Sequence, residues 1–115
     1  MMLPANLEVY LAPGVTDLRK SINGLSALVE AVMELDLFSG YVFGFCNRNR
    51  DLIKLLYWDR NGFALWIKRL EHERFHWPNE QATSIQVTGR QLSWLLEGLN
   101  LNQKAHAKLI FQSVG

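Results

Sequence analysis

The sequence predicts an α+β fold: a single domain with a mainly antiparallel β-meander packed with two main helices. Apolar residues recur with helical spacing in two segments, one towards each end of the chain. Between these segments lie apolar runs rich in aromatic and β-branched residues, separated by short polar turns, as is typical of strands. The resulting order of strand, helix, meander and helix favours an α+β domain over alternating parallel units.

The N-terminal part of the chain is predicted to form a strand and then a helix. Residues 7–11 alternate between apolar and polar side chains, and a proline-glycine turn follows them. Thr16 and Asp17 are favourable N-cap residues for a helix that begins at Leu18 and ends between residues 36 and 40. The buried face of this helix is predicted to comprise Ile22, Leu25, Leu28, Val29 and Val32.

The centre of the chain is predicted to form the meander. Apolar runs at residues 41–46, 52–58 and 63–70 have the length and composition of strands. Asn61-Gly62 is a strong signal for a two-residue hairpin turn between the last two runs. A short strand at residues 74–77, ended by a proline, should follow.

The C-terminal part is predicted to form a last short strand at residues 85–87 and a second helix. Thr88 and Gln91 match a capping box, in which each side chain bonds to the backbone N–H of the other residue. Gly98 is a natural stop for this helix. Its buried face should comprise Leu92, Leu95, Leu96 and Leu99.

Length and composition limit the classes of function. The 115 residues are 49% apolar and 20% charged, so the chain can bury the core of one domain. We assign residues 1–101 to this domain and residues 102–115 to a C-terminal tail that could form a short helix. A formal net charge of +1 does not indicate nucleic-acid binding, because phosphate recognition needs local clusters of Lys and Arg.

The sequence also predicts a cytoplasmic protein without membrane contact. The N-terminus lacks the basic start and apolar stretch of a signal peptide. No run approaches the roughly 18 apolar residues of a membrane-spanning helix. Cys46 is the single cysteine and cannot form an internal disulfide, so we interpret it as a small buried apolar residue in a reducing compartment.

Four ordered blocks of residues extend from about Leu7 to Leu101. They are Pro13-Gly14-Val15-Thr16-Asp17-Leu18-Arg19-Lys20 with Asn23-Gly24-Leu25; Asp51-Leu52-Ile53-Lys54-Leu55-Leu56-Tyr57-Trp58-Asp59 with Asn61-Gly62-Phe63; Lys68-Arg69-Leu70-Glu71 with Arg74-Phe75 and Trp77-Pro78; and Arg90-Gln91-Leu92 with Leu95-Leu96-Glu97-Gly98. Together these blocks resemble the small TnpB-type accessory proteins encoded by bacterial insertion sequences of the sixty-six family. The RNA-guided nucleases that share the TnpB name are unrelated and much longer.

This resemblance implies a protein encoded beside a transposase on a mobile element and needed for efficient transposition. It implies no chemistry and supplies no catalytic residues, because cutting and joining of DNA are assigned to the separate transposase. We therefore expect a non-catalytic accessory protein that uses no cofactor. Its expected partner is the transposase of the same element, and direct contact with element DNA and self-association stay open.

The segment His72-Glu73-Arg74-Phe75-His76 spells H-E-x-x-H. On a helix, this pattern places two imidazoles on zinc and a Glu as general base. However, Trp77-Pro78 follows at once, and the residue before a proline avoids helical geometry. In a strand or turn, His72 and His76 would not share the face that the motif requires. A zinc hydrolase is therefore a remote alternative, and solvent-exposed histidines are the plainer interpretation.

A basic surface on the meander is the candidate DNA-binding site. It comprises seven of the twelve basic residues: Arg48, Arg50, Lys54, Arg60, Lys68, Arg69 and Arg74. If Asn61-Gly62 forms the turn, Lys54 lies opposite Arg69, and such a like-charged pair is unfavourable unless a polyanion approaches. The interleaved aromatic residues, which could stack on bases, are Tyr57, Trp58, Phe63 and Trp66. Nearby acidic residues dilute the patch, and any solvated sheet face carries charge.

A protein–protein interface is the competing hypothesis for the same sheet. The chain has four tryptophans, and both faces of the central hairpin carry large apolar groups. Such a sheet needs cover on two sides, from the helices or from a partner. The partner could be the transposase or a second copy of this chain.

The sequence thus favours a binding module over an enzyme. It contains no phosphate loop and no Ser-His-Asp arrangement, and Asp17 in a first helical turn would occupy the positive helix end that an anion needs. We expect an accessory protein that binds the transposase. The alternative is a stand-alone, sequence-nonspecific DNA-binding module, whose affinity should fall steeply with salt.

Overall fold

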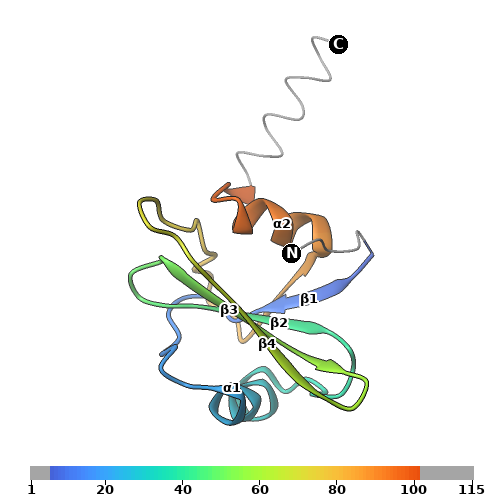
Figure 1. Cartoon of the computed structure of the whole chain (residues 1–115). Helices are drawn as coiled ribbons and strands as arrows, with labels where there is room; N and C mark the ends of the chain where they lie inside the picture. The colour runs from blue at the N-terminus through green and yellow to red at the C-terminus, as the bar shows by residue number, and fades with distance from the viewer. Residues whose placement is uncertain (1–5, 102–115) are drawn as a thin grey trace.

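The computed structural model describes residues 6–101, which form a five-stranded sheet with helical segments on both faces (Figure 1). The elements in chain order are β1 (Glu8–Leu11), α1 (Ile22–Leu28), a π-helical turn η1 (Val29–Met33), β2 (Val42–Cys46), β3 (Leu52–Asp59), β4 (Gly62–Arg69), β5 (Ile85–Thr88) and α2 (Gly89–Leu96). The prediction of one α+β domain with two main helices is confirmed. The predicted tail at residues 102–115 lies outside the described residues.

The sheet has the strand order β4-β3-β2-β1-β5. Strands β2, β3 and β4 form the predicted antiparallel meander, and β5 pairs antiparallel with β1. Strands β1 and β2 are parallel, so the chain must cross from one end of the sheet to the other between them. Helix α1 and the loops on either side of it provide this crossover.

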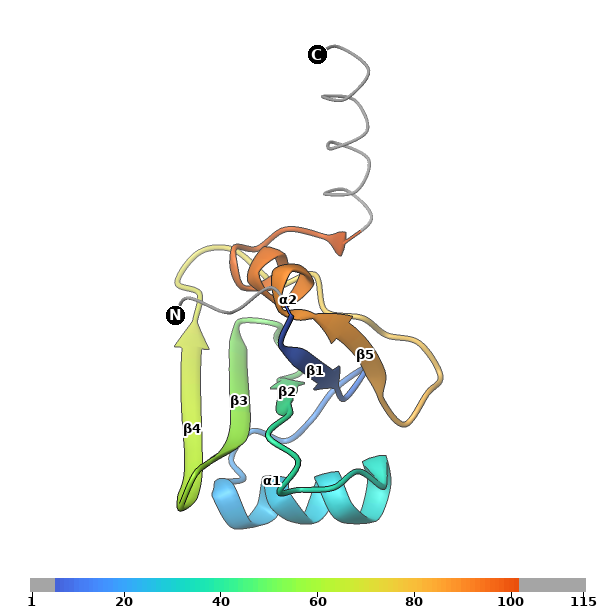
Figure 2. The same ribbon diagram turned by 90° about the vertical axis from the view of Figure 1, so that its right-hand side faces the viewer.

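Two apolar cores lie on opposite faces of the sheet, one under α1 and one under α2 (Figure 2). Strand β2 is buried along its whole length and contributes to both cores. Phe43 and Phe45 pack into the core that contains α1, whereas Val42 and Cys46 pack into the core that contains α2. The continuous apolar character of β2 follows from this central position.

The first helix begins later than predicted, at Ile22 instead of Leu18. The reason is local: the carboxylate of Asp17 accepts hydrogen bonds from the backbone and the guanidinium of Arg19 at 2.8–3.2 Å. Asp17 therefore closes a tight loop instead of capping a helix. Ser21 is the N-cap residue, and its carbonyl oxygen accepts the Leu25 N–H at 3.0 Å.

The helix also ends earlier than predicted, at Met33. Its last turn is π-helical, and Glu34 closes it in a left-handed conformation with φ of 55°. The wider turn brings Met33 into the core in place of Val32, which is 50% exposed. The predicted burial of Leu25 and Val29 is confirmed, whereas that of Val32 is wrong.

The hairpin turn lies one residue earlier than predicted. Asp59 pairs with Gly62, so the turn consists of Arg60 and Asn61, and Arg60 adopts φ of 58°. The register therefore shifts by two residues, which leaves every side chain on its expected face. Lys54 lies opposite Ile67, and the predicted pair of Lys54 with Arg69 is wrong.

The predicted strand at residues 74–77 is also wrong, because this segment is irregular. It is nevertheless firmly held. Phe75 and Trp77 are buried; the Phe75 N–H donates to the Arg50 carbonyl at 2.7 Å, and the Trp77 indole donates to the Ala12 carbonyl at 2.8 Å. These bonds reach loops, not a neighbouring strand, so no ladder forms.

The C-terminal predictions are confirmed. Strand β5 lies where it was expected, and Thr88 and Gln91 form the full capping box at the start of α2. Gly98 follows the helix with φ of 83°. Leu92, Leu95 and Leu96 are buried as predicted, and Leu99 is half-buried.

We predict that Gly44→Ala destabilises the fold by about 1–3 kcal/mol, because an added Cβ overpacks the core. That atom would lie 2.7 Å from Leu11 Cδ2 and 3.2 Å from Trp77 Cη2. Urea denaturation measures the change in the free energy of unfolding. Gly62→Ala is the matched control, because its Cβ would meet no atom within 4 Å. Equal stability of the two variants would contradict the tight packing of β1, β2 and Trp77.

Candidate functional site

The seven predicted basic residues do not gather on one surface. Lys54 lies on the face of β3 that packs towards α1, whereas Lys68 pairs with Ile53 on the face that packs towards α2. Arg60 lies in the β3–β4 turn, at the opposite end of the hairpin from the turn that carries Arg48. The DNA surface expected across the meander is therefore divided between two faces and two ends of the sheet.

Three of these basic side chains bind backbone carbonyl oxygens of distant segments. Lys54 Nζ donates to the carbonyls of Leu18 at 2.6 Å and Lys20 at 2.9 Å. Lys68 Nζ donates to the carbonyl of Leu96 at the end of α2 at 2.8 Å. The guanidinium of Arg50 donates to the Trp77 carbonyl at 2.8 Å. Their charges stabilise loops and the end of a helix. Counting basic residues in the sequence does not reveal this structural role.

The other four predicted residues are exposed. Arg69 forms an ion pair with Glu71 at 3.5 Å, and Arg74 donates to the carbonyl of its neighbour Glu73 at 3.2 Å. Arg48 and Arg60 lie in the two turns at opposite ends of β3. Arg48 lines a surface hollow that a second exposed arginine, Arg19, also lines.

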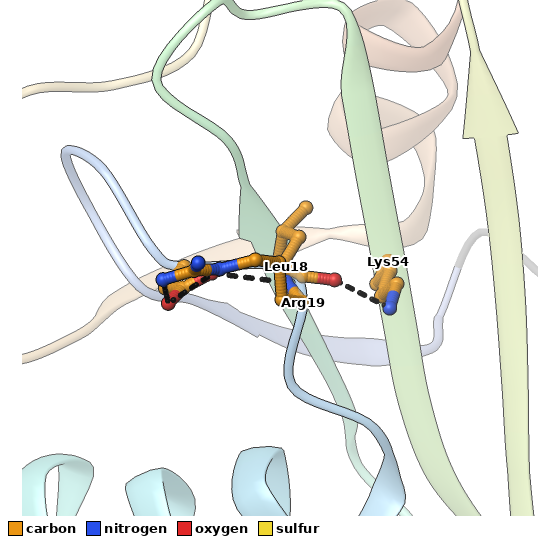
Figure 3. Close-up of polar contacts among 4 residues, drawn as sticks. Leu18, Arg19 and Lys54 are labelled. Carbon is orange, nitrogen blue, oxygen red and sulfur yellow. Dashed lines mark hydrogen bonds and ion pairs between the residues drawn. The ribbon is translucent and has the colours of Figure 1, made fainter.

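The loop between β1 and α1 is fastened to the sheet along its length. Backbone N–H groups of Ala12, Gly14 and Thr16 donate to carbonyls of Gly44, Pro78 and Cys46, each at 2.9 Å. Lys54 holds the second half of the loop, and Figure 3 shows its side chain reaching from β3 to the Leu18 carbonyl. The loop is therefore a rigid part of the fold.

This rigid loop exposes the apolar side chain of Val15 and the charged side chains of Asp17, Arg19 and Lys20 to solvent. Val15 is 49% exposed, and the Arg19 side chain is 91% exposed. The guanidinium of Arg19 binds both carboxylate oxygens of Asp17 and holds the pKa of that carboxyl well below its usual range (Figure 3). Asp17 and Arg19 are thus both charged at neutral pH, although an exposed pair of this kind adds little stability.

Two hollows flank the loop and share Val15, Thr16 and Asp17. One, of about 320 Å³, lies between the loop and the first helix and is lined mainly by apolar side chains, including Leu28, Val32 and Phe45. The other, of about 680 Å³, lies between the loop and the turn after β2 and is lined by Arg19 and Arg48. We call the combined region, with Val15, Asp17, Arg19, Val32 and Arg48, the loop surface.

Only indirect signs of this surface are present in the sequence. Val32 was expected in the core, and the first helix was expected to begin at Leu18, which would have placed Arg19 in a helix and not in a loop. The one signal that could have located it is the first block of the resemblance, Pro13 to Lys20, which coincides with the fastened loop. A loop with a fixed backbone and exposed side chains is a common location of binding residues.

The H-E-x-x-H segment does not form the helix that zinc binding by this motif needs. Residues 72–76 are irregular, and His72, Glu73 and His76 are exposed. Among residues 6–101, no three His, Cys, Asp or Glu side chains lie close enough together to hold a metal ion. The premise of the zinc-hydrolase alternative is therefore wrong.

Cys46 is fully buried, as predicted, and burial raises the pKa of its thiol to about 11. The thiol is protonated at neutral pH and is a poor nucleophile. Within the part of the chain that the structure describes, no helix has the length and apolar character needed to cross a membrane.

The sequence of this chain matches a known family. The model of the family described as IS66 Orf2 like protein matches residues 7–106. The chain belongs to this family. It is therefore an accessory protein of the IS66 group of insertion sequences, the sixty-six family that the sequence blocks resemble, and this family is not known as catalytic.

Similar proteins occur in Sinorhizobium fredii strain NGR234. The uncharacterized protein y4hO is 37% identical over 101 residues, which cover 86% of this chain and 88% of the relative. The uncharacterized protein y4jC is 31% identical over 94 residues, which cover 82% of this chain and 80% of the relative. No solved structure matches this IS66 accessory protein.

We predict that Lys54→Met destabilises the protein by about 1–3 kcal/mol, because two carbonyl oxygens lose a charged donor. Urea denaturation followed by tryptophan fluorescence measures this change. Arg48→Met, in the neighbouring exposed turn, should alter the free energy of unfolding by less than about 0.5 kcal/mol. If the two variants lose the same stability, Lys54 does not fasten the loop.

Proposed function

We propose that this IS66 accessory protein is a non-catalytic cytoplasmic protein that supports transposition by binding the transposase of its element through the loop surface. The observation that carries this proposal is the rigid loop beside an apolar hollow. Val15 and Val32, each about half exposed, line that hollow together. Exposed apolar side chains around a hollow are typical of protein-binding sites.

The distribution of charge supports a protein partner. Apolar side chains form most of the smaller hollow, together with charged Asp17 and Lys20, and Asp17, Arg19 and Arg48 line the larger hollow. An apolar region bordered by charged side chains is the usual composition of a protein–protein interface. Because Asp17 and Arg19 present opposite charges at fixed positions, they can orient a partner that carries complementary charges.

The fastened backbone also favours binding. Ordering a flexible loop in a complex costs free energy, and that cost lowers affinity. Here the bonds to Gly44, Cys46, Pro78 and Lys54 already fix the loop in the free protein. A partner therefore meets a surface whose shape is set before binding.

We predict that Val15→Asp weakens binding to the transposase at least tenfold, because it places a charge in the apolar hollow. Asn61→Asp adds the same charge at the exposed β3–β4 turn, outside the loop surface, and should leave the affinity unchanged. Isothermal titration calorimetry with the purified transposase measures both. Circular dichroism checks that the variants fold. Equal affinity of Val15→Asp and the wild type would exclude the loop surface as the transposase site.

Direct contact with element DNA is a second candidate function, favoured by the meeting of Arg19 and Arg48 across the larger hollow. Both side chains are exposed. Unlike Arg50, Lys54 and Lys68, they do not donate to the carbonyl oxygens of distant segments within residues 6–101. Asp17 opposes this function, because its carboxylate neutralises Arg19 and repels phosphate. The DNA site would therefore be small and should bind without base specificity.

If this site binds DNA, replacing Arg19 and Arg48 with Gln should reduce the slope of log affinity against log salt by about 2, because each phosphate contact contributes roughly 0.9. Fluorescence anisotropy of a labelled duplex with the terminal repeats, titrated across a salt series, measures the slope. Arg60→Gln at the opposite end of the hairpin should not change it. An unchanged slope in the double variant would exclude the site.

A further inference from the structure

Strand β4 forms one edge of the sheet and, among residues 6–101, pairs only with β3 (Figure 2). It has eight residues in continuous register with β3, without proline or bulge. Edge strands in soluble proteins are usually short or protected by charges, proline or a bulge, because their free N–H and C=O groups can pair with another chain. In β4, residues 62–67 are uncharged, and only Lys68 and Arg69 carry charge.

The side chains of β4 from residue 63 to residue 67 are apolar, but none of them is buried. Residues 63–67 are Phe, Ala, Leu, Trp and Ile, and Ile67 is 52% exposed. In the neighbouring β3, by contrast, Ile53, Leu55 and Leu56 are fully buried. The apolar surface continues to Phe38, which is 57% exposed and lies 5.6 Å from the ring of Phe63. An apolar edge strand of this length is typical of a strand that gains a neighbour.

We propose that β4 pairs antiparallel with β4 of a second copy of this chain, so that the two sheets join into one continuous sheet. The two strands would be related by a twofold axis perpendicular to the sheet. Such an axis keeps the α1 side of both copies on the same side. Opposing residues must then belong to the same face, which limits the possible registers.

The sequence of β4 is self-complementary in the register centred on Leu65. Leu65 then lies opposite Leu65 of the second copy, and Phe63 lies opposite Ile67. All three side chains point to the α1 side of the sheet, where they form one apolar stripe across the junction. On the other face, small Ala64 lies opposite large Trp66. Apolar cross-strand pairs of this kind stabilise antiparallel sheets.

The charges on β4 favour the antiparallel direction and a copy of the same chain. Lys68 and Arg69 lie at one end of the strand, and Asp59 lies at the other end of the hairpin. Antiparallel pairing brings the basic end of each copy to the turn of the other, where exposed Asp59 and exposed Arg60 carry opposite charges. Parallel pairing would place the basic residues of the two copies side by side, which is unfavourable.

Sedimentation velocity of the full chain over a concentration series tests the pairing. The wild type should shift from monomer to dimer as concentration rises. Ile67→Glu should raise the dissociation constant at least tenfold, because it puts two carboxylates in the apolar stripe. Ala31→Glu is the control, since Ala31 is also exposed but lies in η1, outside both β4 and the loop surface, and it should dimerise normally. A wild type that stays monomeric, or a dimer that Ile67→Glu leaves intact, would overturn the proposal.

A crosslinking experiment tests the register. In a Cys46→Ala background, Leu65→Cys places two thiols opposite each other and should give a disulfide-linked dimer on mild oxidation. Ile67→Cys should not, because four residues of offset separate the two thiols by about 13 Å, beyond disulfide reach. Crosslinking at 67 and not at 65 would overturn the register centred on Leu65, and crosslinking at both positions would overturn the antiparallel direction, because parallel strands in register bring both pairs of thiols together.

Discussion

The charged hydrogen bonds from Lys54 to the carbonyls of Leu18 and Lys20 determine how the chain crosses the sheet. The parallel pair of β1 and β2 needs a crossover, and its first half is a loop without secondary structure. A half-buried ammonium group needs acceptors, and the loop carbonyls need donors. Each therefore satisfies the other, and the bonds hold the end of the loop against β3 immediately before α1 begins.

The same use of basic residues recurs where Lys68 binds the end of α2 and Arg50 binds the Trp77 carbonyl. In each case a cation on a strand or turn stabilises a segment with no strand partner. Three of the seven basic residues predicted to contact DNA therefore bind carbonyl oxygens of the protein's own backbone. We therefore look for the binding surface in the loop between β1 and α1, which Lys54 holds, and not in the basic residues of the meander.

Local signals predicted most of the fold. Alternating apolar runs located the strands, and the capping box located α2, because both depend on near neighbours. The first helix was misplaced because Asp17 has high N-cap propensity but bonds to Arg19 instead, and the π-helical turn that exposes Val32 has no recognisable pattern. The loop surface could not be predicted, because the bonds that hold its backbone join residues thirty or more positions apart, as those between Thr16 and Cys46 and between Leu18 and Lys54 do.

Pairing of two copies through β4 would bring two loop surfaces into one symmetric dimer. Val32 belongs to η1, on the same side of the sheet as α1, and the proposed twofold axis keeps this side common to both copies. The dimer would thus present two loop surfaces towards one partner assembly. Two weak sites on one rigid sheet can bind a dimeric partner far more tightly than either site alone, provided that the spacing matches. On these two proposals, this accessory protein would influence the transposase by positioning two of its subunits.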